Sequence, residues 1–159
     1  MRSWMFACLL AAMAWWWSAA PATALCLCTC SVSATDVSFG AIDPVASSTV
    51  DGAGVVSVTC SPLAVLASYE VRLSTGVSGV YTARTMRSGA NALSYNLFTD
   101  AGRTQIWGDG SGGTDTRTAS YILTVGNATR TYTMYARAPS VALARPGAYS
   151  DTVTVTVVY

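Results

Sequence analysis

The clearest pattern of hydrophobic and polar positions lies at the end of the sequence, over residues 149–159 (YSDTVTVTVVY). From residue 151 onward threonine alternates with valine, and a period of two over nine residues predicts a β-strand. At about 3.3 Å per residue this strand would span about 30 Å. We expect one of its faces to pack on the core of the protein, and that face carries Val153, Val155, Val157 and Tyr159.

The outer edge of this final strand has no later strand in the sequence to pair with. A long strand that is unpaired on one side is a template for the strand of another chain. We therefore predict that the edge carrying Val153, Val155, Val157 and Tyr159 accepts a strand from a different polypeptide, and that this open edge is the function.

Shorter segments with the same alternation recur between clusters of turn-forming residues, and no helical pattern or internal repeat interrupts them. Gly126-Asn127 predicts a tight hairpin between two of these segments. Roughly seven short strands at regular spacing predict an all-β fold, an immunoglobulin-like Greek-key β-sandwich. Val32, Val37 and Phe39 are the core candidates of the first strand. The expected strands cover residues 29–40, 53–60, 68–74, 93–99, 121–125 and 129–136, and the final segment is the seventh.

The start of the sequence has the features of a secretory signal peptide. Arg2 precedes an apolar run over residues 4–17, and Ala22-Thr23-Ala24 supplies small residues for cleavage after Ala24. The alternative, an uncleaved membrane anchor, is less favoured because the apolar run is short for a membrane span. We expect residues 1–24 to be removed and residues 25–159 to form one mature domain.

The charge of the mature chain excludes one class of partner. The sequence has nine basic residues, all arginine, and eight acidic residues, and Arg2 lies in the predicted signal peptide. The mature net charge is therefore near zero, with no basic patch for nucleic acid. An exported neutral chain rich in Thr, Ser, Gly and Val is typical of a surface or matrix protein.

Four cysteines remain after cleavage, at positions 26, 28, 30 and 60. In an oxidising compartment we expect disulfides, and we predict a Cys30–Cys60 bond between the first strand and the end of the second. Cys26 and Cys28 pair with each other or with another molecule, or stay free; the sequence leaves these alternatives open. A zinc site is disfavoured because the chain has no His and its Cys spacing is unsuitable.

Catalytic chemistry has no support in the sequence. There is no His to act as a base at neutral pH, and no nucleophile elbow, phosphate-binding loop or dinucleotide fingerprint. Asp109 and Asp115 flank a Gly-rich loop, but two carboxylates without a bidentate Glu do not form a calcium loop. We interpret the loop as a surface loop, and we expect neither an enzyme nor a bound cofactor or metal.

Together these residues resemble the spore coat protein U domain family, which includes subunits of archaic chaperone–usher pili. Each motif is weak alone, but their order and spacing run through the whole mature chain. The motifs are Cys30-Ser-Val-Ser-Ala34, Phe39-Gly40, the strand ending at Cys60, residues 69–76, residues 84–86, residues 93–97 with Asp100, Trp107-Gly-Asp-Gly110, and Gly147-Ala-Tyr-Ser-Asp151 before Val-Thr-Val.

The resemblance implies a pilin-type immunoglobulin fold that lacks its last strand. A periplasmic chaperone supplies that strand during export, and at the outer-membrane usher the extension of a neighbouring subunit replaces it. It implies a subunit that passes through the periplasm to an extracellular pilus, or fimbria, with a role in adhesion and biofilm. No cofactor and no nucleic acid enter this function.

A subunit that also donates a strand needs an alternating extension of ten or more residues before its first core strand. Only residues 25–29 would precede Cys30 after cleavage, so we expect a tip or minor subunit that accepts a strand without donating one. Two other functions stay open: a self-contained secreted carbohydrate-binding module, and a structural protein of a spore or cell coat.

Overall fold

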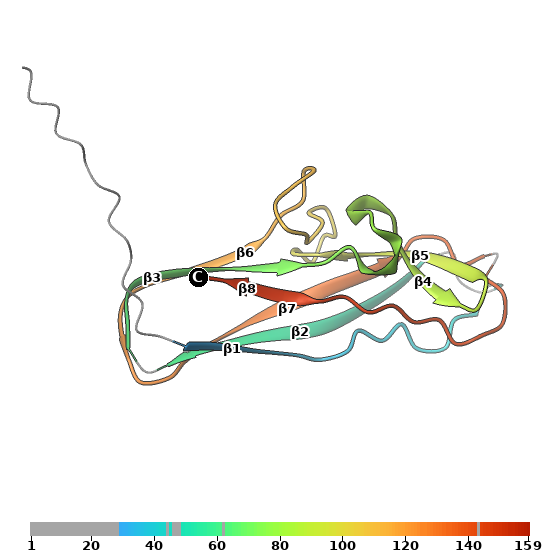
Figure 1. The fold of residues 1–159 in the computed structure, drawn as a ribbon. Helices are drawn as coiled ribbons and strands as arrows, with labels where there is room; N and C mark the ends of the chain where they lie inside the picture. Colours follow the sequence, from blue (N-terminus) through green and yellow to red (C-terminus); the bar gives the residue numbers. More distant parts are fainter. Residues whose placement is uncertain (1–28, 44, 46–48, 62, 143) are drawn as a thin grey trace, which may run out of the picture.

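The computed structural model describes residues 29–43, 45, 49–61, 63–142 and 144–159 (Figure 1). The predicted signal peptide, residues 1–24, lies outside the described residues, as do Cys26 and Cys28. The regular secondary structure of the described residues is β-strand, apart from two single-turn 3₁₀ helices, η1 (Gly76–Ser78) and η2 (Tyr81–Ala83). The strands are β1 (Thr29–Ala34), β2 (Val50–Ser61), β3 (Leu63–Leu73), β4 (Arg84–Ser88), β5 (Asn91–Phe98), β6 (Arg117–Val125), β7 (Ala128–Ala138) and β8 (Val155–Val158).

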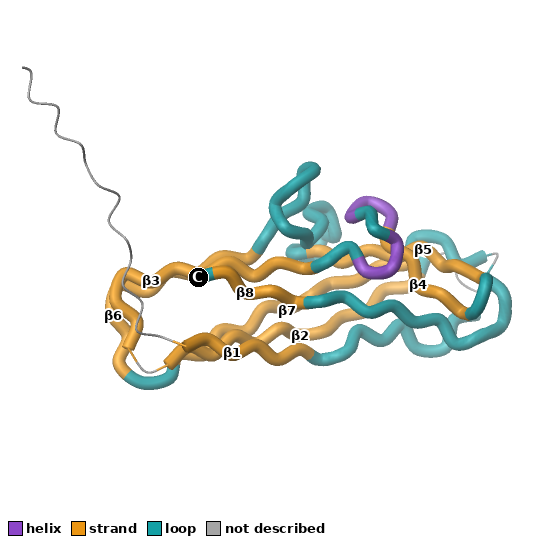
Figure 2. The backbone as a smooth tube through the Cα atoms, in the orientation of Figure 1, coloured by secondary structure: helices purple, strands orange, loops and turns teal. Residues whose placement is uncertain are grey.

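The strands form two antiparallel sheets that face each other across the core (Figures 1 and 2). One sheet has the order β1-β2-β7-β5-β4 and the other the order β6-β3-β8. The expected immunoglobulin-like sandwich is confirmed. The chain turns between β6 and β7 as expected, with Gly126 at a φ of 90°, but the predicted hairpin is wrong. β6 pairs with β3 whereas β7 pairs with β2 and β5, so the turn carries the chain from one sheet to the other.

Alternation along the strands selects which side chains enter the core. On β2, Val56, Val58 and Cys60 are buried, while the residues between them are at least partly exposed. A disulfide joins Cys60 to Cys30, its register partner on β1, in agreement with the predicted pairing. The other fully buried side chains include Val71, Leu73, Trp107, Ala136, Ala138 and Val141.

Arg84 is buried although it is charged, and it organises the end of the sandwich where β4 and β5 lie. Its guanidinium donates to the carbonyl oxygens of Ser74 (2.8 and 3.1 Å) and Trp107 (2.8 Å) and to Oδ1 of Asn96 (2.8 Å). Burial lowers the pKa of Arg84, but an arginine stays protonated in proteins. The planar fork therefore ties the end of β3 to β5 and to the loop after it, a role that the sequence pattern does not reveal.

Two expectations about individual segments were wrong. Of the final segment, only Val155–Val158 is a strand, because the residues before it cross from one sheet to the other. The first strand ends at Ala34, and Val32, expected in the core, is 41% exposed because β1 is an edge strand.

Candidate functional site

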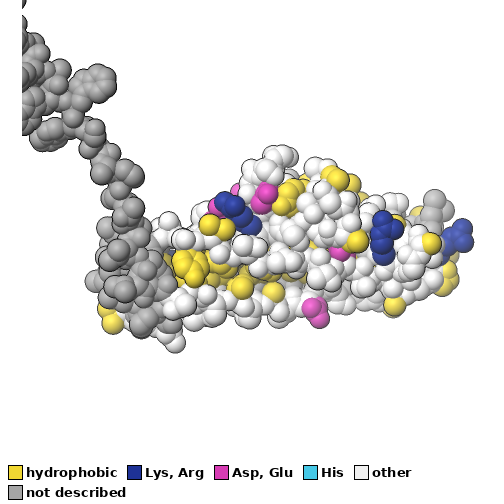
Figure 3. All heavy atoms as spheres, viewed as in Figure 1, with side chains coloured by type: hydrophobic (Ala, Val, Ile, Leu, Met, Phe, Trp, Pro, Cys, Tyr) yellow, Lys and Arg dark blue, Asp and Glu magenta, His cyan; other side chains and the backbone are white. Residues whose placement is uncertain are grey.

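Strand β8 pairs on one edge only. Its partner is β3, in a register that runs from Leu73 opposite Val155 to Glu70 opposite Val158. Among the described residues nothing pairs with the other edge, which lies on the side of β1 of the opposite sheet (Figure 1). In the same view, hydrophobic side chains reach the surface along the stretch between β8 and β1 (Figure 3).

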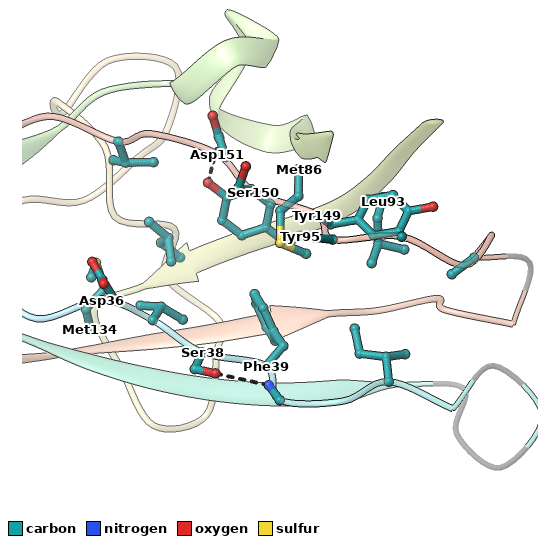
Figure 4. Close-up of a pocket in the computed structure, with 18 of the residues that line it drawn as sticks. Asp36, Ser38, Phe39, Met86, Leu93, Tyr95, Met134, Tyr149, Ser150 and Asp151 are labelled. Atoms are coloured by element: carbon teal, nitrogen blue, oxygen red, sulfur yellow. Dashed lines mark hydrogen bonds between the residues drawn. The ribbon is translucent and has the colours of Figure 1, made fainter. Parts of the chain in front are cut away.

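A cavity of about 990 Å³ lies beside this edge, between two segments that are distant in sequence. One wall is the chain that follows β1, residues 34–42, and the other is residues 144–155, which lead into β8. We call this cavity and its two walls the groove; Figure 4 shows side chains from both walls and from the floor.

The floor of the groove is apolar and comes mainly from the five-stranded sheet, with Leu73 of β3 from the other sheet. Met86 of β4, Leu93 and Tyr95 of β5 and Met134 of β7 all line it, and all are buried beneath it. Methionine side chains are unbranched and polarisable, so they adapt to side chains of different shapes. The floor therefore suits a row of inserted apolar side chains better than one ligand of fixed outline.

Residues 36–42 of the first wall pack Val37 and Phe39 toward the core and, among the described residues, pair with no strand. The Gly40 N–H donates to the hydroxyl of Ser38 (3.2 Å; Figure 4). Phe39 contacts Tyr95 edge-to-face, with 6.1 Å between ring centres. Val37 lies against Gly54 of β2, where a Cβ would come within 2.9 Å of the valine side chain, so only glycine allows this approach. Among the described residues, no backbone–backbone hydrogen bond involves residues 36–42.

The second wall is fixed to the body of the protein along its inner edge. Ser150 exchanges two backbone hydrogen bonds with Arg87 of β4, at 2.9 and 3.0 Å. Four residues later Thr154 bonds to Ser74, whose N–H donates to the Thr154 carbonyl and whose hydroxyl accepts from the Thr154 N–H, both at 2.9 Å. The wall thus passes from the β4 sheet to the β3 sheet while its outer edge stays free.

Asp151 fastens this wall at the point where it crosses. One carboxylate oxygen accepts from the backbone N–H groups of Val77 (2.9 Å) and Thr152 (2.8 Å), and the other from the hydroxyl of Tyr95 (2.7 Å; Figure 4). Burial, together with the bond to Asp151, raises the pKa of Tyr95, so its phenol remains a neutral donor at physiological pH. Gly76 lies so close that any side chain there would collide with the carboxylate.

The residues predicted for the acceptor edge divide between the groove and the surface. Val153 and Val155 line the groove, and Val157 is half-buried against the core next to it. Tyr159, expected on the same face, is 61% exposed. Sequence reasoning placed Asp151 in a motif and Val37 and Phe39 in the first strand but assigned neither to a binding site, because the local pattern does not show which distant segment each one contacts.

The chemistry of the groove favours binding over catalysis. It offers unpaired backbone groups on both walls and apolar side chains beneath, the combination that accepts an added β-strand. In the part of the chain that the structure describes, no three His, Cys, Asp or Glu residues are placed to hold a metal ion. Likewise, no helix among the described residues is long and apolar enough to cross a membrane.

Comparisons with known proteins agree with this geometry. The family model of the Spore Coat Protein U domain matches residues 17–156, which confirms the resemblance seen in the sequence motifs. A similar fold occurs in the crystal structure of the CsuC–CsuE chaperone–tip adhesion subunit pre-assembly complex from archaic chaperone–usher Csu pili of Acinetobacter baumannii. The similarity to a chain of that complex has a TM-score of 0.56 at 22% identity and covers 84% of this protein but 40% of that chain. No curated protein matches the sequence.

Proposed function

Because the chain belongs to the spore coat protein U domain family, we propose that it is a structural subunit of an extracellular pilus, assembled by the chaperone–usher pathway. The observation that supports this most directly is the groove, a sandwich edge with free backbone groups and an apolar floor. A strand from another polypeptide fills the groove by pairing with the outer edge of β8 and of the residues on either side of it; the acceptor residues are Val153, Val155, Val157 and Tyr159.

The partners follow from the order of assembly. After export through the signal peptide, residues 1–24, a periplasmic chaperone fills the groove first. At the outer-membrane usher, a strand from a neighbouring subunit replaces the chaperone, and the subunit reaches the cell surface. The similar fold in a chaperone–tip adhesion subunit complex supports the chaperone step. Within the pilus we assign the chain a tip or minor position, with a role in adhesion and biofilm.

The energies are consistent with this assembly. A donor strand that inserts four or five apolar side chains gains about 1.5–3 kcal/mol for each, or about 6–15 kcal/mol in all before ordering costs. A whole domain is usually stable by only about 5–15 kcal/mol. The domain with an empty groove should therefore be marginally stable and prone to aggregate, and the completed domain should be very stable.

Periplasmic expression with and without the chaperone of the same assembly system tests the proposal. We expect the chain alone to be degraded, and the chaperone to recover it as a one-to-one complex. Val155→Asp, in the groove, should abolish that complex. Val158→Asp is the matched control, because Val158 is exposed on the opposite face of the same strand and should leave the complex intact.

Two results would contradict the proposal. One is a soluble chain that unfolds cooperatively as an isolated monomer and does not bind the chaperone. The other is equal complex formation by the Val155 and Val158 variants. A self-contained carbohydrate-binding module needs a sandwich closed by its own strand, and the described residues contain no strand on the outer edge of β8.

A further inference from the structure

The sandwich has a second free edge, at the opposite side of the three-stranded sheet. Strand β6 pairs with β3 from Val125 opposite Leu63 to Arg117 opposite Val71. Within the described part of the chain, no strand pairs with its other edge and no further backbone hydrogen bond involves residues 118–125. β6 is longer than β8 and contains neither lysine nor proline, two residues that commonly protect strand edges.

One arginine lies across this edge. Arg130 is on β7, in phase with the inward-facing Tyr132 and Met134, yet its side chain is exposed at the side of the sandwich. Its guanidinium carbon is 5.3 Å from the centre of the Tyr121 ring of β6. Arg130 also borders a shallow hollow of about 410 Å³, whose other walls are Ser68 and residues 118–120.

A strand added to β6 would run about 4.8 Å from it, along the hollow that Arg130 borders. Among the described residues the Arg130 guanidinium has no hydrogen bond and no carboxylate partner. Covering it would therefore bury an unpaired charge, which proteins strongly disfavour. Contact with the face of an aromatic ring holds the guanidinium in this position.

We propose that Arg130 keeps the β6 edge closed to strand addition, and that without it this edge pairs with the same edge of a second copy of the chain. The groove beside β8 differs from this edge: its Asp151 is already hydrogen-bonded to Tyr95 and to two backbone N–H groups, and its other charged lining residues, Asp36 and Arg145, are exposed on its two walls. If the proposed function holds, a pilus grows only through β8 and does not branch. The closure of the β6 edge itself does not rest on the proposed function.

The experiment compares the oligomeric state of three variants by light scattering after size-exclusion chromatography. The sample is the isolated chain if it is soluble, and otherwise the chaperone complex. Arg130→Ser should bind a second copy of the chain with a dissociation constant at least about tenfold lower than that of the wild type. Arg130→Lys retains the charge and should behave as the wild type does. Arg87→Ser is the matched control: it removes the same charge from β4, whose outer side Ser150 already partly covers.

Amide hydrogen exchange then locates the contact. In the associated Arg130→Ser protein, the amides of residues 118–125 should exchange more slowly while those of residues 155–158 are unchanged. The proposal is overturned if Arg130→Ser stays at the wild-type mass, if Arg87→Ser associates equally, or if protection appears at β8 instead of β6. Failure of the chaperone to bind would contradict the proposed function and leave this comparison possible in the isolated chain.

Discussion

Replacing Gly76 by alanine tests how the second wall of the groove is held in place. Gly76 has a φ of 67°, and a Cβ at this position would collide with the nearer carboxylate oxygen of Asp151. Gly79, three residues later, has a φ of 73° and open space around its Cβ position. Both glycines thus have a left-handed backbone, but only at Gly76 would a side chain also collide with a neighbouring group.

The expected free energies of unfolding follow from this difference. Gly79→Ala should cost about 1–2 kcal/mol, the price of a left-handed backbone for a residue with a Cβ. Gly76→Ala has the same backbone cost. It also displaces Asp151, whose carboxylate accepts hydrogen bonds from Tyr95, Val77 and Thr152. A buried phenol left without its acceptor costs about 1–3 kcal/mol alone. Gly76→Ala should therefore cost about 2–4 kcal/mol more than Gly79→Ala.

Urea unfolding of the disulfide-bonded mature chain measures both free-energy costs. If the domain with an empty groove is too unstable for this assay, the same measurement is made with a donor strand bound in the groove. Trp107 is the only tryptophan after residue 24 and is fully buried, so its fluorescence reports the transition. In an Asp151→Ala background the extra cost of Gly76→Ala should disappear, because the colliding carboxylate is gone. Equal costs for the two glycine variants, or an extra cost that persists without Asp151, would refute the role of this contact.

Three further changes have expected outcomes. Removing the disulfide with Cys30→Ala and Cys60→Ala together should lower stability by about 3–4 kcal/mol, since the bond closes a separation of 30 residues, as urea unfolding with and without reductant would measure. Arg84→Lys should cost several kcal/mol in the same assay and leave the buried acceptors unsatisfied, because an ammonium cannot reproduce the planar fork. The hydrogen bond from Arg137 lowers the pKa of Asp51, so this ion pair stabilises the fold above the ordinary pKa of an aspartate and is lost as pH falls through the lowered value. Asp51→Asn should therefore cost at most about 1 kcal/mol at neutral pH, and nothing in strong acid, when unfolding is followed against pH.

The strands were predictable because their signal is local. Alternation on β2 and β7 reports burial on one face directly, so both strands and the turn between β6 and β7 were identified from residue types alone. The ends were harder to place. Residues 151–154 continue the Thr/Val alternation of β8 but do not form a strand there, because bonds from Ser150 to β4 pull them toward the other sheet. Such long-range contacts leave no mark on the local pattern.

The groove was predictable only in part for a similar reason. An unpaired final strand follows from the order of hydrophobic runs, so Val153 and Val155 were identified as lining residues. The opposite wall depends on Gly54, which has no side chain and so leaves room for Val37. A glycine within a strand pattern does not indicate which residue packs against it. Asp151 was likewise hidden, because an aspartate beside a strand usually serves a turn.

The two walls of an apolar groove in water should collapse onto each other. In this protein, hydrogen bonds to the body of the domain oppose that collapse. The wall that leads into β8 is held by the hydrogen bonds of Asp151 and Ser150, all made on its inner edge. The wall after β1 is held by Val37 against β2 and, at its start, by hydrogen bonds in both directions between Thr35 and Val55 of β2. Each wall is thus fixed without using the backbone groups that face the groove. An incoming strand then meets an acceptor that is already ordered, so little of its binding energy is spent on arranging the site. By this reasoning, loosening Asp151 should weaken strand binding even where the completed domain remains folded.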